Sequence, residues 1–298
     1  MSEIVQYLPS ALKGARVPVY LWLPEGEVKA VIQFVHGMAE HMERYDESAR
    51  YLAARGFAVV GHTHCGHGAE TALPGYFGHG EGWDNLLSDI HQVRLWARER
   101  FPGLPYFMLG HSMGSFLTRC YLLDHADGLA GAVLSGTGFY PRCLTLAAKA
   151  LSGAFILAGR GKKPSPFINQ FVCGDGGTQW LSRDENAQAA YAADPTCGFV
   201  FTAWGFFTLF TGLDRLAQPK KLKAIPPALP VYLFSGDRDP VGQMGEGVKK
   251  VAKEYQTAGL TRVTLKLYPE GRHEMFNEIN RREVYRDLAA WLEAQVKD

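Results

Sequence analysis

Tyr106–Gly114 reads YFMLGHSMG, and this stretch is the strongest indication of the fold in the chain. A short apolar run with strand character leads into the pattern G-x-S-x-G, and a helical pattern follows directly. Such a strand–turn–helix setting presents a serine hydroxyl at the end of a strand, exposed to a substrate. We expect Gly110, His111 and Gly114 to form the tight turn, since its crowded backbone favours glycine. Ser112 is therefore predicted to be a nucleophile; a merely structural turn is the alternative.

Runs with strand character recur along the chain on both sides of this stretch. They are Val5–Leu8, Val17–Leu23, Val31–His36, Phe57–Gly61, Tyr106–Gly110, Ala130–Ser135, Val231–Ser235 and Val263–Tyr268. The first two can form an antiparallel hairpin, and the alternating last run suits a position near the edge of a sheet. The others are apolar throughout, which is typical of strands buried on both faces, and helical patterns separate them. This alternation predicts an α/β fold with a doubly wound, mostly parallel sheet of eight strands.

Residues 139–218 interrupt the alternation, because they contain helical patterns but no clear strand. Their apolar side chains are concentrated in Leu144–Ala158 and Gly198–Phe210. We expect residues 1–138 and 219–298 to form the core and residues 139–218 to form a helical cap over it. Apolar walls with few polar groups suit an acyl chain. The candidate pocket residues are His36, Gly37, Phe155, Phe199, Trp204 and Phe207.

Composition excludes several classes of protein. Of the 298 residues 47% are hydrophobic, and 31 basic residues balance 30 acidic ones, so nothing favours nucleic-acid binding. The five cysteines form no CxxC pair, which predicts reduced thiols in a cytoplasmic protein. The start of the chain has no signal-peptide pattern, and no apolar run reaches about 20 residues, so we expect no stable membrane insertion. The oligomeric state is left open.

A serine hydroxyl needs a base, and in this architecture an acid and then a histidine follow later strands. His273 follows the last predicted strand and is the only histidine beyond His125. The loop after the preceding strand holds both Asp237 and Asp239. Its spacing and the Pro-Val that follows favour Asp239 as the acid. Asp237 would then cap the turn or pair with Arg238.

The loop HGMAEH, residues 36–41, follows the strand Val31–His36. A loop at this place can supply one backbone N–H donor to an oxyanion, and the residue after the nucleophile supplies the other. We therefore expect the amides of Met38 and Met113 to form the oxyanion hole. The side chains of His36 and Glu40 are expected to brace the loop.

Five motifs occur in a characteristic order along the chain: HGMAEH, GHG at residues 66–68, GHSMG, the loop of Asp239, and His273. In these motifs the chain resembles the monoglyceride lipase and lysophospholipase branch of the α/β-hydrolases. That branch is also described as serine-aminopeptidase-like. The resemblance implies an α/β-hydrolase fold, a lid over an acyl pocket, a monoacyl ester as substrate and no cofactor. One departure is Thr63, which stands where the family motif D-x-x-G-H-G has aspartate, and it leaves one brace of the loop in doubt.

A metal site is a minor alternative. The stretch GHTHCGHG brings His62, His64, Cys65 and His67 close in sequence, and imidazole and thiolate are ligands that zinc accepts. The family resemblance already accounts for the glycines of this stretch, and Glu70 is the one carboxylate close by. We therefore expect no metal.

The class of substrate leaves further alternatives open. A serine aminopeptidase would need acidic residues that bind an amine, and the insertion contains some. A general short-chain carboxylesterase would use the same nucleophile on smaller acyl groups. A non-catalytic binding protein on the same fold is the third alternative, although candidates for all three members of a catalytic triad are present. The apolar insertion favours an ester of a monoacyl lipid.

Overall fold

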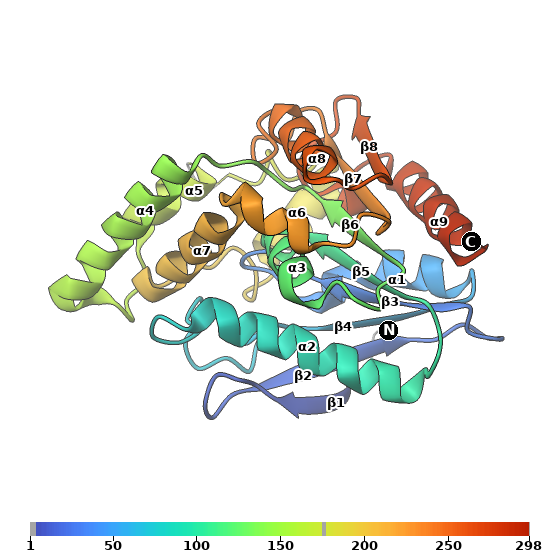
Figure 1. The fold of residues 1–298 in the computed structure, drawn as a ribbon. Coiled ribbons are helices and arrows are strands. Elements are labelled where there is room, and N and C mark those ends of the chain that lie inside the picture. Colours follow the sequence, from blue (N-terminus) through green and yellow to red (C-terminus); the bar gives the residue numbers. More distant parts are fainter. Residues whose placement is uncertain (1–3, 175–176, 298) are drawn as a thin grey trace.

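The computed structural model describes residues 4–174 and 177–297, and its centre is one sheet of eight strands in the order β1-β2-β4-β3-β5-β6-β7-β8 (Figure 1). The strands are β1 (Ile4–Pro9), β2 (Arg16–Trp22), β3 (Ala30–Val35), β4 (Phe57–His62), β5 (Tyr106–His111), β6 (Gly131–Ser135), β7 (Val231–Gly236) and β8 (Val263–Tyr268). β1 pairs with β2 and β2 with β4 in the antiparallel sense, and all other pairs are parallel. The predicted mostly parallel sheet is confirmed, including the hairpin at its start and the edge position of its last strand.

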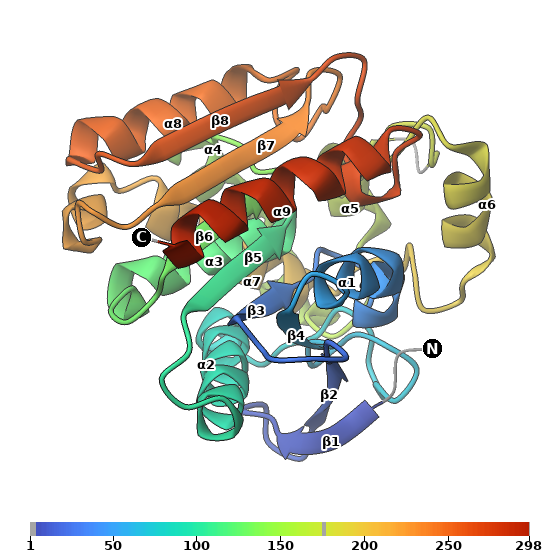
Figure 2. The same cartoon turned by 90° about the vertical axis from the view of Figure 1, so that its right-hand side faces the viewer.

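Helices cover both faces of the sheet, as expected for a doubly wound fold (Figure 2). Helices α1 and α9 pack together on one face, against side chains such as Phe34 and Phe234. Helices α2, α3 and α8 cover the other face. Their bounds are α1 (Asp46–Ala53), α2 (Gly82–Arg100), α3 (Met113–His125), α8 (Glu246–Ala258) and α9 (Arg281–Lys297), with 3-10 turns at Met42–Tyr45, Pro219–Ala224 and Met275–Asn277.

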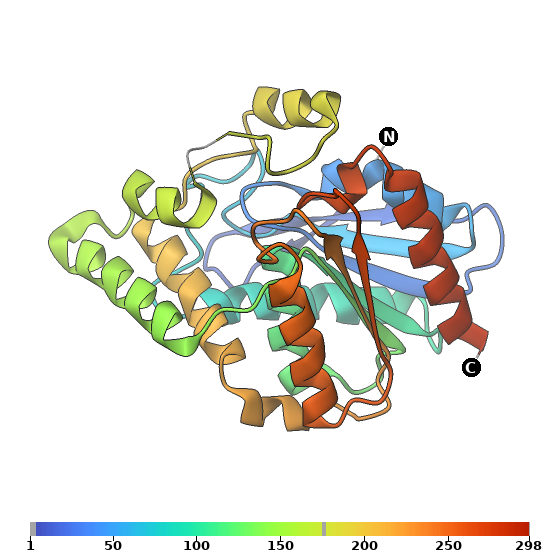
Figure 3. The same cartoon turned by 90° about the horizontal axis from the view of Figure 1, so that it is seen from above.

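The remaining helices lie beside the sheet, on the side where its parallel strands end (Figures 1 and 3). They are α4 (Arg142–Phe155), continued by a π-helical turn at Ile156–Arg160, α5 (Pro166–Cys173), α6 (Glu185–Ala193) and α7 (Ala203–Leu216). Helix α7 packs on α2 and α3, and α4 packs along α7. The described part of residues 139–218 contains no strand, apart from an isolated bridge between Pro164 and Thr202.

The longest apolar helix differs from the sequence-based expectation. Arg142–Arg160 is, among the described residues, the one helix long and apolar enough to cross a membrane by length and composition alone, and most of it is exposed. The sequence analysis identifies the apolar stretch Leu144–Ala158 but counts no run of about 20 residues here, because Arg142, Lys149 and Arg160 limit it. Its position along α7, far from either terminus in sequence, is that of a helix with one packed face and one outward face.

Candidate active site

The turn after β5 holds Ser112 in a strained conformation, with φ 53° and ψ −121°, at the N-terminus of α3. Two glycines make this turn possible. A Cβ atom on Gly110 would lie 2.2 Å from the carbonyl oxygen of Gly114, and one on Gly114 would lie 2.0 Å from that of Val35. Neither position has room for a side chain, so the G-x-S-x-G pattern is required here by close backbone packing.

Three side chains from the ends of three strands form a continuous hydrogen-bonded chain. His273 Nε2 lies 2.8 Å from Oγ of Ser112, and His273 Nδ1 lies 3.0 Å from Oδ1 of Asp239. Oδ2 of Asp239 accepts a hydrogen bond of 2.7 Å from Ser235, and Oδ1 accepts one of 2.9 Å from the amide of Val241. Such an arrangement can supply a nucleophile, a base and a group that orients the base.

The electrostatics of this chain follow from burial and pairing. Asp239 is fully buried, which opposes its ionisation, but the imidazole of His273 and the hydrogen bonds it accepts bring its pKa below the ordinary value. Burial likewise opposes protonation of His273, yet the carboxylate of Asp239 raises the pKa of this histidine above its usual value. The pair therefore favours an ionised aspartate that stabilises the imidazolium form of its neighbour.

The neighbouring aspartate has a different environment. Oδ1 of Asp237 accepts a hydrogen bond of 2.8 Å from the amide of Glu270 and lies 3.8 Å from Arg238, and its side chain is 38% exposed. It thus closes the turn between the loops after β7 and β8. Of the two candidate acids, the structure places Asp239 beside His273 and Asp237 at the surface.

The loop after β3 offers a backbone amide at the site. The amide of Gly37 donates to Oε1 of Glu40, and the amide of Ala39 donates to Nε2 of His67. Between them, the Met38 amide has no acceptor among the described residues. The amide of Met113 belongs to the first turn of α3, where N–H groups lack an intrahelical acceptor. Both methionines line the same cavity as the serine.

The side chain of Glu40 fixes this loop from below. Oε1 also accepts a hydrogen bond of 2.7 Å from the hydroxyl of Tyr45, and Oε2 accepts one of 2.6 Å from Arg44. Arg44 forms a second ion pair of 2.7 Å with Glu274, next to His273 in sequence. Although burial opposes ionisation of Glu274, its arginine partner lowers the pKa to about 2. The loop after β3 and the loop of His273 thus share one buried arginine.

The departure at Thr63 is compensated by its hydroxyl. Oγ1 of Thr63 accepts a hydrogen bond of 3.1 Å from the amide of Met42, and its own amide donates to the carbonyl oxygen of Pro18. The amide of His64 donates to Nε2 of His36 at 2.9 Å. The stretch at Thr63 is therefore held by the threonine hydroxyl and by the hydrogen bond between His64 and His36.

The histidines of the GHTHCGHG stretch are buried and hold one another. His64 Nδ1 lies 3.0 Å from Nε2 of His62, and burial lowers the pKa of His64 to about 4 and that of His67 to about 3. These rings are neutral and act as hydrogen-bonding groups inside the loop. Together with Cys65 they do not form a group of converging ligands within the described part of the chain.

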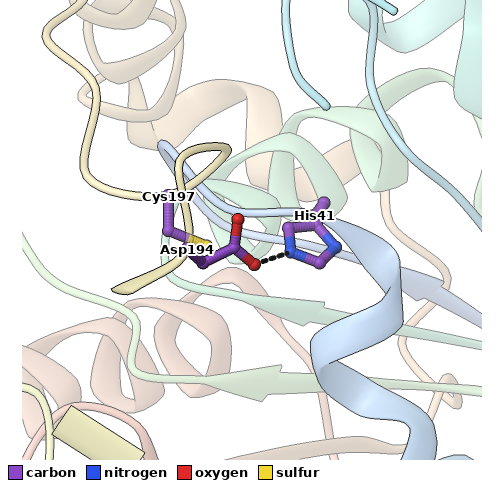
Figure 4. Close-up of side chains that lie close together, drawn as sticks. All are labelled: His41, Asp194 and Cys197. Atoms are coloured by element: carbon purple, nitrogen blue, oxygen red, sulfur yellow. Dashed lines mark hydrogen bonds and ion pairs between the residues drawn. The ribbon is translucent and has the colours of Figure 1, made fainter. Parts of the chain in front are cut away.

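A different group of three ligand-type side chains lies close together: His41, Asp194 and Cys197 (Figure 4). Oδ2 of Asp194 lies 2.8 Å from Nε2 of His41, and burial raises the pKa of the Cys197 thiol to about 12. The amide of Gly198 and the hydroxyl of Tyr191 both donate to the carbonyl oxygen of Ala39. The group therefore ties the segment before α7 to the loop that carries the Met38 amide.

A cavity of about 280 Å³ opens above Ser112, and most of its lining is apolar. Of the candidate pocket residues, Gly37 and Phe199 line it. Apolar side chains that are not among the candidate pocket residues also contribute. They include Phe116, Leu144, Phe171, Trp180, Leu209, Phe210 and Leu213.

Four candidate pocket residues do not line this cavity. His36 is fully buried behind the loop, where Nδ1 bonds to the Gly37 carbonyl and Nε2 accepts from the amide of His64. Phe155 stacks on Phe167 at 6.0 Å, and Trp204 packs against Phe207 at 5.6 Å. For Trp204 and Phe207 the reason is that α7 is apolar on both faces, and composition alone cannot tell which face meets the cavity. Which face of α7 meets the cavity depends on how this helix packs on α2 and α3, and the sequence does not show that packing. Phe155 ends α4 and His36 follows β3, and neither is among the residues that line the cavity.

Comparisons with known proteins agree with this geometry. Residues 26–280 match the family model described as serine aminopeptidase, S33. A monoacylglycerol lipase of Mycolicibacterium smegmatis is 29% identical over 288 residues, which cover 94% of this chain and 93% of that protein. The human monoglyceride lipase is 28% identical over 278 residues, covering 87% and 84% of the two chains.

A solved structure extends the likeness to three dimensions. The carboxyl esterase from Bacillus coagulans, in complex with glycerol, superposes with a TM-score of 0.89 at 28% identity and covers 98% of each chain. A monoglyceride lipase variant from Saccharomyces cerevisiae superposes with a TM-score of 0.80 at 19% identity, which bears on the fold alone. The chain belongs to the serine aminopeptidase S33 family of α/β-hydrolases, in its monoglyceride lipase branch, and is an ester hydrolase.

Proposed function

We propose that this enzyme hydrolyses carboxylic esters of monoacyl lipids, in the manner of a monoacylglycerol lipase, through Ser112, His273 and Asp239. One observation carries the proposal: the hydrogen-bonded chain of these side chains ends at a serine oxygen that faces a largely apolar cavity of about 280 Å³. Such a cavity binds an acyl chain by removing its apolar surface from water. The relatives named as monoacylglycerol lipases support the same substrate class.

The reaction follows from the positions of the side chains. As Oγ of Ser112 attacks the ester carbonyl carbon, its proton passes to Nε2 of His273, and Asp239 stabilises the resulting imidazolium. The negative charge on the carbonyl oxygen is stabilised by the amides of Met38 and Met113. Collapse of the tetrahedral intermediate breaks the bond to the leaving alcohol, which takes the proton from His273. A water molecule then repeats these steps on the acyl-enzyme, releasing the fatty acid and free serine.

We also propose that residues 139–218 act as a cap on a core formed by residues 1–138 and 219–298. The described helices of that segment supply much of the apolar wall of the cavity, from α4, α5 and α7. The cysteines with described side chains are free thiols, which supports the proposed cytoplasmic location because disulfides are rare there.

The outward face of this cap is suited to a lipid surface. Five apolar side chains of the segment are exposed: Leu144, Leu146, Leu157, Phe167 and Phe171. From residue 142 to residue 173 the chain has five basic residues and no acidic residue. We propose that this apolar and basic face rests on an anionic lipid surface without spanning it. Leu144 and Phe171 also line the cavity, so exposed apolar side chains of the segment adjoin the pocket.

An aminopeptidase function is less well supported by the site. The two carboxylates that line the cavity, those of Glu40 and Glu274, both form ion pairs with Arg44. A carboxylate already paired with a buried arginine has little capacity left to bind the amino group of a peptide. The ester reaction needs no such partner, since the oxyanion amides and the triad complete it.

The test is hydrolysis of p-nitrophenyl esters from acetate to palmitate, beside a monoacylglycerol, a lysophospholipid and an aminoacyl anilide. We expect higher kcat/KM for the longer esters and for the monoacylglycerol, and no turnover by Ser112→Ala. The control Ser88→Ala removes an exposed serine that does not line the cavity. A preference for the anilide, or wild-type activity of Ser112→Ala, would overturn the proposal. Turnover of short esters alone would instead assign a general carboxylesterase.

A further inference from the structure

The imidazole of His273 lies between two other rings. On one side the ring of His111 is 4.8 Å away, centroid to centroid, with an interplanar angle of 45°. On the other side the indole of Trp180 is 5.1 Å away at an angle of 33°. His111 belongs to the core strand β5, whereas Trp180 belongs to the segment between α5 and α6. The proposed base is therefore covered by a side chain of the proposed cap.

Backbone hydrogen bonds hold this indole in place. The amide of His273 donates to the carbonyl oxygen of Trp180 at 3.3 Å, and the amide of Glu274 donates to that of Leu181 at 2.7 Å. The two segments thus run side by side for two residues. A sliding movement of the indole away from the imidazole would break both bonds.

A buried carboxylate strengthens the same connection. Glu278 is fully buried and accepts hydrogen bonds from the amide and Nε of Arg183, each of 3.0 Å, and from the amide of Arg272 at 3.1 Å. Arg183 follows Trp180 by three residues, and Arg272 directly precedes His273. The indole and the imidazole are consequently fixed on two segments that share one ion-paired anchor.

We propose that Trp180 is a positioning residue for His273, whose indole face orients the imidazole and stabilises the imidazolium that forms when Ser112 gives up its proton. The inference rests on the proposed function, because it assigns Trp180 a role through the base of that reaction. The proton balance is unchanged: it leaves Oγ of Ser112, resides on Nε2 of His273 and passes to the leaving alcohol.

The face of an indole carries partial negative charge and attracts a cation placed over it. The charged groups that act on His273 are the carboxylates of Asp239, Glu274 and Glu40, which all favour the imidazolium. His111 adds no repelling positive charge, because burial lowers its pKa to about 3 and keeps it neutral. Trp180 therefore adds an aromatic face to the effect of these carboxylates on His273.

Two substitutions distinguish an effect of the aromatic face of Trp180 from an effect of any apolar side chain that covers the imidazole. Trp180→Leu keeps an apolar side chain over the imidazole but removes the aromatic face, and Trp180→Phe retains a weaker one. With a p-nitrophenyl ester as substrate, we expect Trp180→Leu to lower kcat about three- to tenfold. In the pH profile of kcat/KM, the acid limb is the rise of the rate at low pH, and we expect its apparent pKa to fall by about half a unit. Trp180→Phe should show about half of each effect on a logarithmic scale.

A matched control is Trp204→Leu, which removes an indole of the same cap segment that does not line the cavity. It should leave both kcat and the acid limb at wild-type values. A readout independent of turnover is the titration of the His273 imidazole by NMR in a Ser112→Ala background, assigned with His273→Gln. We expect Trp180→Leu to lower that pKa by about half a unit.

The outcomes distinguish the inference from the function on which it rests. If Ser112→Ala is inactive while Trp180→Leu matches the wild type in kcat, acid limb and imidazole titration, only the role of Trp180 is wrong. If Ser112→Ala retains activity, the proposed function itself fails. If Trp180→Leu does not fold, as judged by thermal unfolding, Trp180→Phe decides. Wild-type values for that variant, in both the rate profile and the titration, would then refute the role.

Discussion

Oε1 of Glu40 lies 2.5 Å from the amide nitrogen of Gly37, so a buried carboxylate holds the backbone immediately before the Met38 amide. The same oxygen accepts the hydroxyl of Tyr45, and the other oxygen pairs with Arg44. A cavity opens directly above this loop. The position of the proposed oxyanion donor thus depends on a side chain that need not touch the substrate.

Glu40→Gln should therefore impair catalysis without removing any member of the triad. An amide at this place still accepts the Gly37 bond but offers Arg44 no negative charge. We expect kcat to fall about tenfold or more and the free energy of unfolding to fall by about 1–3 kcal/mol. The measurements are kcat on a p-nitrophenyl ester and urea unfolding. Glu270→Gln, which removes an exposed partner of Arg238, is the control and should change neither.

The choice between two aspartates gives a second prediction. Asp239→Asn should reduce kcat by about 10³–10⁴, because an amide leaves the imidazole of His273 in the wrong tautomer. Asp237→Asn removes only a surface hydrogen bond to the amide of Glu270, so its kcat should stay within about twofold of the wild type. Comparable losses in the two variants would show that the geometry has been misinterpreted.

The pH dependence of kcat/KM tests the proposed base, His273. His273 must be neutral to accept the proton from Ser112, and the Asp239 carboxylate raises its pKa above the ordinary value of about 6.5. A raised pKa keeps the imidazole protonated to higher pH. The rate should therefore increase with pH through an apparent pKa above about 6.5 and then reach a plateau. A half-maximal rate at pH 5.5 would contradict this assignment.

Much of the fold and of the proposed triad could be predicted from the sequence, because both depend on local patterns. Strands buried on both faces are apolar throughout, and the parallel sheet followed from their alternation with helices. The turn at Ser112 has no room for side chains on either glycine, so the motif records a steric requirement. The loops of Asp239 and His273 follow strands whose ends adjoin in a parallel sheet.

The pocket could not be predicted in the same way, because it depends on how the helices of the proposed cap pack. Helix α7 is apolar on both faces, so Trp204 and Phe207 looked as suitable as Leu209 and Phe210. The link between His41 and Asp194 joins residues 153 positions apart and follows from no local pattern. Nor did any signal single out Trp180, whose contact with His273 is made by a non-helical segment.

The buried histidines make the stability of the folded protein depend on pH. Burial lowers the pKa of five of them: His36, His62, His64, His67 and His111. A histidine with a lowered pKa in the folded state binds fewer protons there than in the unfolded chain, so stability falls as pH decreases below about 6.5. Each of these histidines makes the free energy of unfolding fall by up to about 1.4 kcal/mol for each unit by which the pH decreases. The raised pKa of His273 acts in the opposite sense, but it can offset the contribution of only one histidine.

We therefore expect the free energy of unfolding to fall by several kcal/mol between pH 7.5 and pH 5.5. Urea unfolding curves at intervals of half a pH unit give the slope. A control at 0.5 M salt separates this effect from surface charge pairs, which salt screens. A flat profile between these two pH values would mean that the histidines are protonated in the folded protein.

The last prediction concerns the outward face of the proposed cap. Leu157 is 91% exposed and does not line the cavity, so its substitution leaves the chemistry at Ser112 untouched. Leu157→Ser should reduce hydrolysis of a monoacylglycerol embedded in vesicles several-fold, while hydrolysis of a dissolved short-chain ester stays at the wild-type rate. Replacing Lys162 and Lys163 by glutamine should weaken binding to vesicles that contain phosphatidylglycerol, by about 1 kcal/mol per charge, more than binding to pure phosphatidylcholine. Ile279→Ser, 59% exposed and outside the cap segment, is the matched control and should affect neither assay. Equal loss on the dissolved ester would instead mean that the substitution disturbs the active site, and unchanged vesicle activity would mean that this face does not meet lipid.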